Sequence, residues 1–273
     1  HIVLMLLKQG HEVYSLYRHV SNRPPISEAN IVYGDIRDSV FLNKELPMIN
    51  PEIIIHLAAL TPVSLSHEQP IEYTETNYVG TLNLAHAAMK CSNLKMFVAN
   101  TTSECYGIQD DENIPIQEMA ELKPNTPYAI AKAAAEMYFK NYLGPAYNFP
   151  YFLVCPFNSY GRRTTNHFVI ESVITKMLQN KDKITVGNTA PVRDFVFIDD
   201  VVRAYDIFLN GVENLVGETY IHTNTKVNVC TGRGISIKDL ITLIGEKLGW
   251  KGKIIENSTY QRPTEIPTLI GNC

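Results

Sequence analysis

Three consecutive isoleucines, Ile53 to Ile55, constrain the fold more than any other segment of this chain. A short unbroken run of β-branched residues is typical of a strand buried on both faces, and such strands belong to parallel sheets that helices cover. Similar apolar runs recur along the first half of the chain. We therefore predict further strands at residues 12–17, 30–33, 95–100 and 151–155.

Segments with apolar residues at helical spacing separate these strands. We predict helices at residues 1–9, 39–49, 73–89 and 128–143. In the first of them Ile2, Met5 and Leu6 share one face, and Gly10 ends the helix. Strands that alternate with helices predict an α/β fold of the Rossmann type, with a doubly wound parallel sheet.

After Pro156 the rhythm changes. We predict helices at 166–178, 199–209 and 236–248, strands at 184–186, 193–198 and 226–230, and irregular structure over 251–273. On this basis residues 1–157 form a dinucleotide-binding domain, to which residues 193–230 return. Residues 158–192 and 231–273 form a smaller C-terminal lobe that binds substrate.

The composition excludes several classes of function. The formal net charge is -4, and no run of Lys and Arg resembles a nucleic-acid site. No apolar stretch is long enough to span a membrane. The five cysteines are scattered without a CxxC pair, so we expect reduced thiols, no metal site and a cytoplasmic location.

Tyr128 and Lys132 form the strongest candidate for chemistry. Four residues apart on a helix, they share one face, and an ammonium beside a phenol lowers the pKa of the phenol. Tyr128 is then a plausible general acid and base. A tyrosine and a lysine on a solvated helix face would have the same spacing.

Two further candidates follow predicted strands, at the sheet edge where parallel sheets bind ligands. Residues 100–107 (NTTSECYG) bring hydroxyls and a carboxylate that could bind a sugar hydroxyl and take a proton. Residues 56–59 (HLAA) bring small side chains that let a ligand approach the backbone. An ordinary turn and core packing are the alternative interpretations.

The order of these pieces resembles the extended short-chain dehydrogenase/reductase family, the NAD(P)-dependent nucleotide-sugar epimerases and dehydratases. The resemblance covers essentially the whole chain. Its motifs are GDIRD at 34–38, HLAA at 56–59, NYVGT at 77–81, TSECYG at 102–107, Tyr128 with Lys132, PFNSYG at 156–161, RDFVFIDDV at 193–201 and Arg262-Pro263.

The resemblance implies a role for each matching residue. Tyr128 is the acid and base, Lys132 binds the nicotinamide ribose, and Thr102 binds the reacting sugar hydroxyl. The other cofactor-binding candidates are Arg18, Asp35, Ile36, Leu57, Ala58, Ala59, Asn77, Asn100 and Pro156. The other substrate-binding candidates are Ser103, Asn158, Arg193 and Arg262. Arg193 could also form an ordinary surface ion pair.

The resemblance also implies a nucleotide-diphosphate sugar as substrate, NAD or NADP as cofactor, and a homodimer. Arg18, where an acidic residue would favour NAD, slightly favours NADP. Relative to the family, the chain lacks a first strand and the glycine-rich phosphate loop ahead of His1. We expect that the chain in this form binds the dinucleotide poorly.

The outcome of the reaction depends on the residue that acts on the sugar after its oxidation at C4. Glu104, two positions after Thr102, stands where 4,6-dehydratases carry the base for the C5 proton. Thr-Ser-Glu resembles GDP-mannose 4,6-dehydratases and also UDP-glucuronic acid decarboxylases. We predict a 4,6-dehydratase or an epimerase that acts through a 4-keto sugar, with a decarboxylase or a non-catalytic nucleotide-sugar sensor as alternatives.

Overall fold

The computed structural model of the chain describes residues 1–18, 24–161, 168–213, 224–257 and 264–273. The α-helices are α1 (Ile2–Lys8), α2 (Ser39–Ile49), α3 (Val63–Glu68), α4 (Pro70–Thr74), α5 (Gly80–Ala88), α6 (Pro127–Tyr138), α7 (Gly144–Tyr147), α8 (Val169–Gln179), α9 (Ile198–Glu213) and α10 (Ile237–Leu248). The π-helical segments are η1 (Glu75–Val79) and η4 (Phe139–Leu143), and the 3-10 turns are η2 (Ser103–Tyr106) and η3 (Asp111–Asn113).

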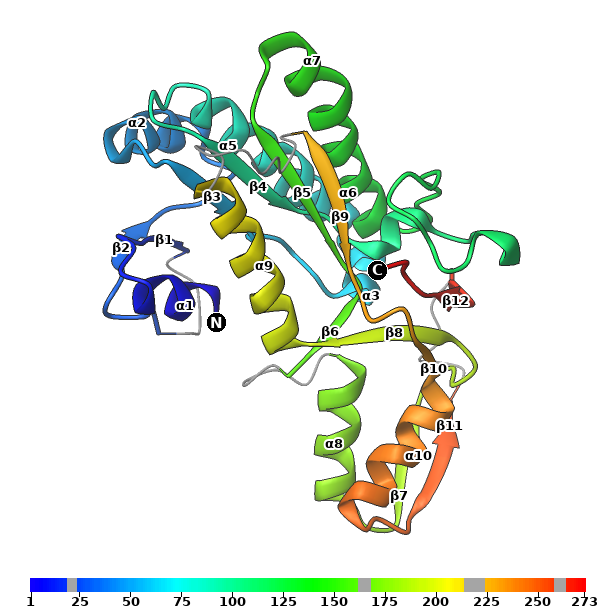
Figure 1. Cartoon of the computed structure of the whole chain (residues 1–273). Coiled ribbons are helices and arrows are strands. Elements are labelled where there is room, and N and C mark those ends of the chain that lie inside the picture. Colours follow the sequence, from blue (N-terminus) through cyan, green and yellow to red (C-terminus); the bar gives the residue numbers. More distant parts are fainter. Residues whose placement is uncertain (19–23, 162–167, 214–223, 258–263) are drawn as a thin grey trace.

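The strands build the sheets in Figure 1. They are β1 (Tyr14–Tyr17), β2 (Asn30–Tyr33), β3 (Ile53–His56), β4 (Met96–Asn100), β5 (Tyr151–Pro156), β6 (Asn158–Tyr160), β7 (Lys183–Val186), β8 (Val192–Phe197), β9 (Thr225–Val229), β10 (Gly234–Ser236), β11 (Lys253–Glu256) and β12 (Thr268–Leu269). The main sheet has the order β3-β4-β5-β9, and each of its pairs is parallel. The strands β1 and β2 form a parallel pair of their own.

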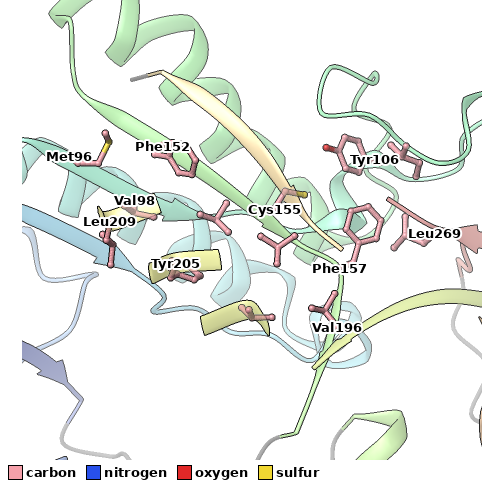
Figure 2. Packing of buried hydrophobic residues seen from close by; sticks show 14 of the residues in the cluster. Met96, Val98, Tyr106, Phe152, Cys155, Phe157, Val196, Tyr205, Leu209 and Leu269 are labelled. Atoms are coloured by element: carbon pink, nitrogen blue, oxygen red, sulfur yellow. The ribbon is translucent and has the colours of Figure 1, made fainter. Parts of the chain in front are cut away.

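Helices cover both faces of the main sheet, which confirms the predicted doubly wound architecture. Along β4, Met96 and Val98 join a core with Tyr205 and Leu209 of α9 (Figure 2). Their neighbours Phe97 and Ala99 point to the opposite face, into a core with α2, α5 and η4. This alternation follows from the two-residue period of a strand.

The predicted apolar face of the first helix is confirmed as well. Ile2, Met5 and Leu6 pack against the core on the α9 side of the sheet. The predicted helices at 73–89 and 128–143 are each interrupted by a π-helical segment, η1 and η4 respectively. Each predicted helix is therefore a succession of α-helical and π-helical segments and not one regular helix.

A second group of elements lies below the main sheet in Figure 1. Strand β8 pairs with β6 and β12 in parallel and with β10 in antiparallel orientation. The lobe beyond it holds α8, α10 and the pair β7–β11 around a small core with Met177 and Ile241. Within the described residues β8 lies in this second sheet, β9 lies in the main sheet, and α9 packs against the main sheet.

The prediction of irregular structure over residues 251–273 was wrong. The segment contains β11 and β12. All four residues of β11 are exposed, so the strand lacks the alternation of buried and exposed side chains that marks a strand in sequence. The two residues of β12 are too few to give any pattern.

Candidate active site

Helix α6 carries Tyr128 and Lys132 into the interior. Thr126 caps the helix by accepting a hydrogen bond from the Ala129 amide at 3.1 Å, and Pro127 occupies the first turn. Tyr128 is 8% exposed and Lys132 is 4% exposed. The pair therefore faces the protein, and the alternative of a solvated helix face is excluded.

The turn η2 brings the second group of candidates to the same place. It follows β4, and Thr102 caps it by accepting a hydrogen bond from the Glu104 amide at 3.3 Å. Gly107 closes the turn at φ 61°, where an added Cβ would overlap the carbonyl oxygen of Lys123. Ser103 and Glu104 are buried within the turn.

Thr102 and Tyr128 are hydrogen-bonded to each other, and the Glu104 carboxylate is close enough to raise the pKa of Tyr128. The structure thus joins three of the predicted catalytic residues, although Tyr128 lies 26 positions after Thr102 and 24 after Glu104 in sequence. A hydroxyl, a phenol and a carboxylate in one buried cluster can bind a sugar hydroxyl and move protons to and from it.

The prediction that the pKa of Tyr128 is lowered was wrong. Burial raises the pKa of Tyr128 well above its usual value, and the hydrogen bond from Thr102 only partly opposes that effect. Burial also lowers the pKa of the Lys132 ammonium, to about 8. Desolvation disfavours each charged form, and it is the largest cause of both shifts.

Asn100 links Lys132 to a residue that the sequence did not suggest. Lys132 Nζ donates to the Asn100 carbonyl oxygen at 2.7 Å, and Tyr205 Oη of α9 donates to Asn100 Oδ1 at 2.9 Å. A buried ammonium has three donors, so Lys132 has room for the two hydroxyls of a ribose. Tyr73 was also missed, and its ring meets that of Tyr128 edge to face, with centroids 6.2 Å apart.

The loop after β3 carries the small cofactor-binding candidates. Leu57 and Ala58 are exposed, and Ala59 is half-buried. Asn77 holds this loop, because it accepts from the Leu60 amide and donates to the Leu60 carbonyl, both at 2.8 Å. Asn77 therefore acts on the shape of the loop, since both ends of its side-chain amide are engaged there.

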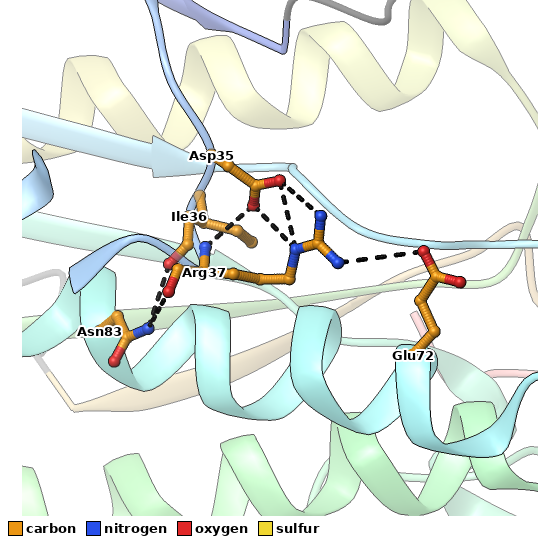
Figure 3. A network of polar contacts seen from close by, with 5 residues as sticks. All are labelled: Asp35, Ile36, Arg37, Glu72 and Asn83. Atoms are coloured by element: carbon orange, nitrogen blue, oxygen red, sulfur yellow. Dashed lines mark hydrogen bonds and ion pairs between the residues drawn. The ribbon is translucent and has the colours of Figure 1, made fainter.

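Asp35 lies at the end of β2 in a network of charges (Figure 3). The Arg37 guanidinium binds both oxygens of Asp35, at 2.8 to 3.2 Å, and also approaches Glu72 of α4 at 4.0 Å. Hydrogen bonds from Arg37 lower the pKa of Asp35. Ile36 is buried in the core, and Arg18 is exposed at the end of β1.

The substrate-binding candidates lie on the strands beyond Pro156. Asn158 of β6 has a buried Oδ1 without a hydrogen-bond partner in the described structure, as expected of a group that awaits a ligand. Arg193 of β8 is 5% exposed and forms an ion pair with Glu265 at 2.7 Å. It is therefore not a surface residue, and Arg262 lies outside the described residues.

Two features bear on other classes of site. Over the described ranges, no three His, Cys, Asp or Glu side chains are grouped so that they could hold a metal ion. No helix in the part of the chain that the structure describes is long and apolar enough to cross a membrane.

Known proteins resemble this chain along its whole length. A family model described as GDP-mannose 4,6 dehydratase matches residues 1–273. A putative UDP-glucose 4-epimerase of Methanocaldococcus jannaschii is 30% identical over 270 residues, which cover 97% of this chain and 82% of that protein. GDP-mannose 4,6 dehydratase 2 of Caenorhabditis elegans is 29% identical over 308 residues, covering 98% of this chain and 77% of that protein.

Solved structures agree on the fold. A UDP-glucose 4-epimerase of Thermotoga maritima, solved with UDP-glucose, superimposes with a TM-score of 0.86 at 27% identity. The match covers 100% of this chain and 85% of that one.

Proposed function

The chain belongs to the GDP-mannose 4,6 dehydratase family, and we propose that it is a nucleotide-sugar 4,6-dehydratase that uses a nicotinamide dinucleotide. The observation that carries this proposal is the buried cluster of Thr102, Glu104 and Tyr128 beside Lys132. An enzyme that only turns a ketone over has no use for a carboxylate at this position, whereas a dehydratase needs a base for the C5 proton.

The residues divide the chemistry between them. Thr102 binds the 4-hydroxyl of the sugar, and Tyr128 takes its proton as the phenolate, a form that the positive charge of a bound oxidised nicotinamide would favour. A bound nicotinamide dinucleotide would supply the hydride acceptor for this oxidation, and Lys132, Asp35 and the loop at 57–59 would hold it. The resulting 4-ketone acidifies the hydrogen at C5. Glu104 takes that proton and gives it to the departing C6 hydroxyl, so that water is lost. The hydride would then return from the cofactor to C6 while a proton from solvent adds to C5, which leaves a 4-keto-6-deoxy sugar and the cofactor in its original oxidation state.

The substrate's charged part needs separate partners. We assign the sugar and the diphosphate to Asn158 and Arg193, and the nucleotide to Arg262, because a planar guanidinium matches phosphate oxygens. Arg18 at the end of β1 favours the 2′-phosphate of NADP.

Replacement of Glu104 tests the dehydratase assignment. In deuterated water the wild-type enzyme should release a product that has lost water and carries solvent deuterium at C5. Glu104→Gln should lose this product by roughly 100-fold or more in kcat, because general base catalysis is worth about 10²–10⁴-fold. The matched control is Glu112→Gln, at an exposed position in η3.

A 4-epimerase is the second candidate, and the putative UDP-glucose 4-epimerase that is 30% identical favours it. An epimerase would form a product of unchanged mass, and its turnover would survive Glu104→Gln. In that case Glu104 is a bystander to the reaction, and the assignment of the base is wrong.

Tyr128→Phe separates an enzyme from a sensor on the same fold. The phenyl ring keeps the packing against Tyr73 and removes the group that exchanges the proton. Turnover should collapse by roughly 10²–10⁴-fold while binding of the nucleotide sugar, measured by calorimetry, hardly changes. A sensor would bind its ligand equally well and would have no turnover to lose in either form.

We further propose that the enzyme is a homodimer that pairs through the helices α4 to α7. Large apolar side chains are exposed on this layer, including Ile71 at 70%, Ile130 at 53% and Met137 at 52%. Exposed apolar side chains on neighbouring helices are typical of an interface between subunits.

A further inference from the structure

Strand β9 places a charged residue, Lys226, deep beneath the candidate active site. Its side chain is 3% exposed, and its Nζ lies 2.9 Å from Oε1 of Glu136, whose side chain is fully buried. Burial alone would lower the pKa of Lys226, but Cys155 and the Glu136 carboxylate outweigh it, and the pKa is raised. Lys226 is therefore a buried positive charge that its partners stabilise.

Glu136 connects this charge to the helix that carries the catalytic pair. It lies on α6, four residues after Lys132 and eight after Tyr128, and all three side chains are buried. Residues at this spacing lie one above the other along a single helix face. A contact that fixes Glu136 therefore fixes the rotation of α6 and with it the direction of Tyr128.

Tyr106 connects the same charge to the catalytic turn. The Lys226 ammonium lies over the Tyr106 ring, 4.1 Å from its centroid, in cation–π geometry. Tyr106 Oη also donates to Asn228 Oδ1 on β9 at 2.7 Å. Tyr106 ends η2, the turn that Thr102 caps and that contains Glu104. Strand β9 thus makes two contacts with the turn, both of them through Tyr106.

We propose that Lys226 is a positioning residue, which sets the spacing between Tyr128 on α6 and Thr102 and Glu104 on η2. It reaches α6 through Glu136 and η2 through Tyr106, and it lies on neither of them. A buried ion pair adds little to stability compared with apolar side chains of similar volume. Its presence here is therefore explained by the geometry that it imposes, and the proposal rests on the function proposed above.

The test replaces both residues of the ion pair by apolar side chains in the full-length protein. The double variant Glu136→Leu/Lys226→Met leaves no buried charge behind, so its melting temperature should equal or exceed that of the wild type. Its kcat should fall by roughly 10- to 100-fold at an unchanged KM, because small displacements of reacting groups are costly. The single variant Lys226→Met is measured beside it.

The chain offers a matched control. Lys140 also approaches Glu136, with Nζ 3.6 Å from Oε1. This contact joins residues four positions apart along the same helical stretch and does not involve the turn η2. Lys140→Met should therefore keep the wild-type kcat. A double variant that is stable and fully active would overturn the proposal, and so would a loss of activity that only follows a loss of stability.

Hydrogen exchange makes the test independent of the substrate. The amides of Cys105 and Gly107 are bonded within the turn, to the carbonyls of Thr102 and Glu104. They should exchange faster in the double variant and at the wild-type rate in Lys140→Met. If the wild type turns over no nucleotide sugar, the proposed function fails alone. If exchange in the turn does not change, the role of Lys226 fails alone.

Discussion

At the scale of single residues, burial of the catalytic Lys132 lowers the stability of the folded protein. Burial lowers the pKa of its ammonium from 10.5 to about 8. The unfolded chain therefore binds a proton more tightly at this residue, and the difference corresponds to about 3 kcal/mol against folding at neutral pH. The hydrogen bond to the Asn100 carbonyl offsets part of this penalty.

The variant Lys132→Met should therefore be inactive and yet gain stability relative to the wild type at pH 7. Between pH 8 and pH 10.5 the unfolded wild type binds more protons at Lys132 than the folded protein does, so the stability of the wild type rises with pH. The advantage of the variant should shrink by about 2–3 kcal/mol from pH 7 to pH 10.

Urea unfolding of both proteins at the two pH values measures this change. The control is Lys183→Met at an exposed position of β7, which removes a lysine of the same chemistry from the surface. A difference for Lys132→Met that is independent of pH would contradict the account of its burial.

At the scale of elements, the catalytic turn depends on Gly107. Gly107→Ala would require φ near 61° from an alanine and would also push a methyl group into the Lys123 carbonyl. We expect the variant to lose about 2–4 kcal/mol of stability from strain and overpacking together. Activity should fall as well, since the turn carries Thr102 and Glu104.

Gly249, which ends α10 at φ 62°, separates the two causes. An added Cβ there meets nothing within 4 Å, so Gly249→Ala carries only the conformational cost of about 1 kcal/mol. Thermal unfolding of both variants gives the comparison. Equal losses at the two glycines would mean that the contact with Lys123 does not constrain the turn.

The elements of the site could be predicted where the pattern that marks them lies within one segment of the sequence. Ile53 to Ile55 marked β3, and the four-residue spacing of Tyr128 and Lys132 placed both on one face of α6 by helix geometry alone. The pKa of Tyr128 was predicted in the wrong direction, because the extent of burial depends on how other elements cover the helix.

Contacts between segments that are distant in the chain could not be predicted from the sequence. Tyr205 reaches Asn100 across 105 positions, and Lys226 reaches Glu136 across 90. Each of these residues falls inside a correctly predicted helix or strand, but no local pattern indicates which element will pack beside which. The same reason applies to β8, whose pairing with β6, β10 and β12 no local pattern indicates.

At the scale of the whole molecule, the α4 to α7 layer should hold two copies together. Ile130→Arg places a charge in this proposed interface and should convert the dimer to a monomer, because a buried unpaired charge is costly. Sedimentation velocity measures the state. Ile207→Arg, at the exposed face of α9 on the other side of the sheet, should leave the dimer intact.

A wild-type protein that sediments as a monomer would contradict this interface directly. A dimer that resists Ile130→Arg but dissociates with Ile207→Arg would move the interface to α9.

The mass of the product tests the central claim most directly. The wild-type enzyme is incubated with NAD or NADP and, in turn, with GDP-, UDP-, dTDP- and CDP-sugars, and the products are analysed by mass spectrometry. We predict that one nucleotide sugar loses a single water, which requires a base at C5 and gives Glu104 its role. A product of unchanged mass that elutes at a new position would contradict the dehydratase and identify an epimerase.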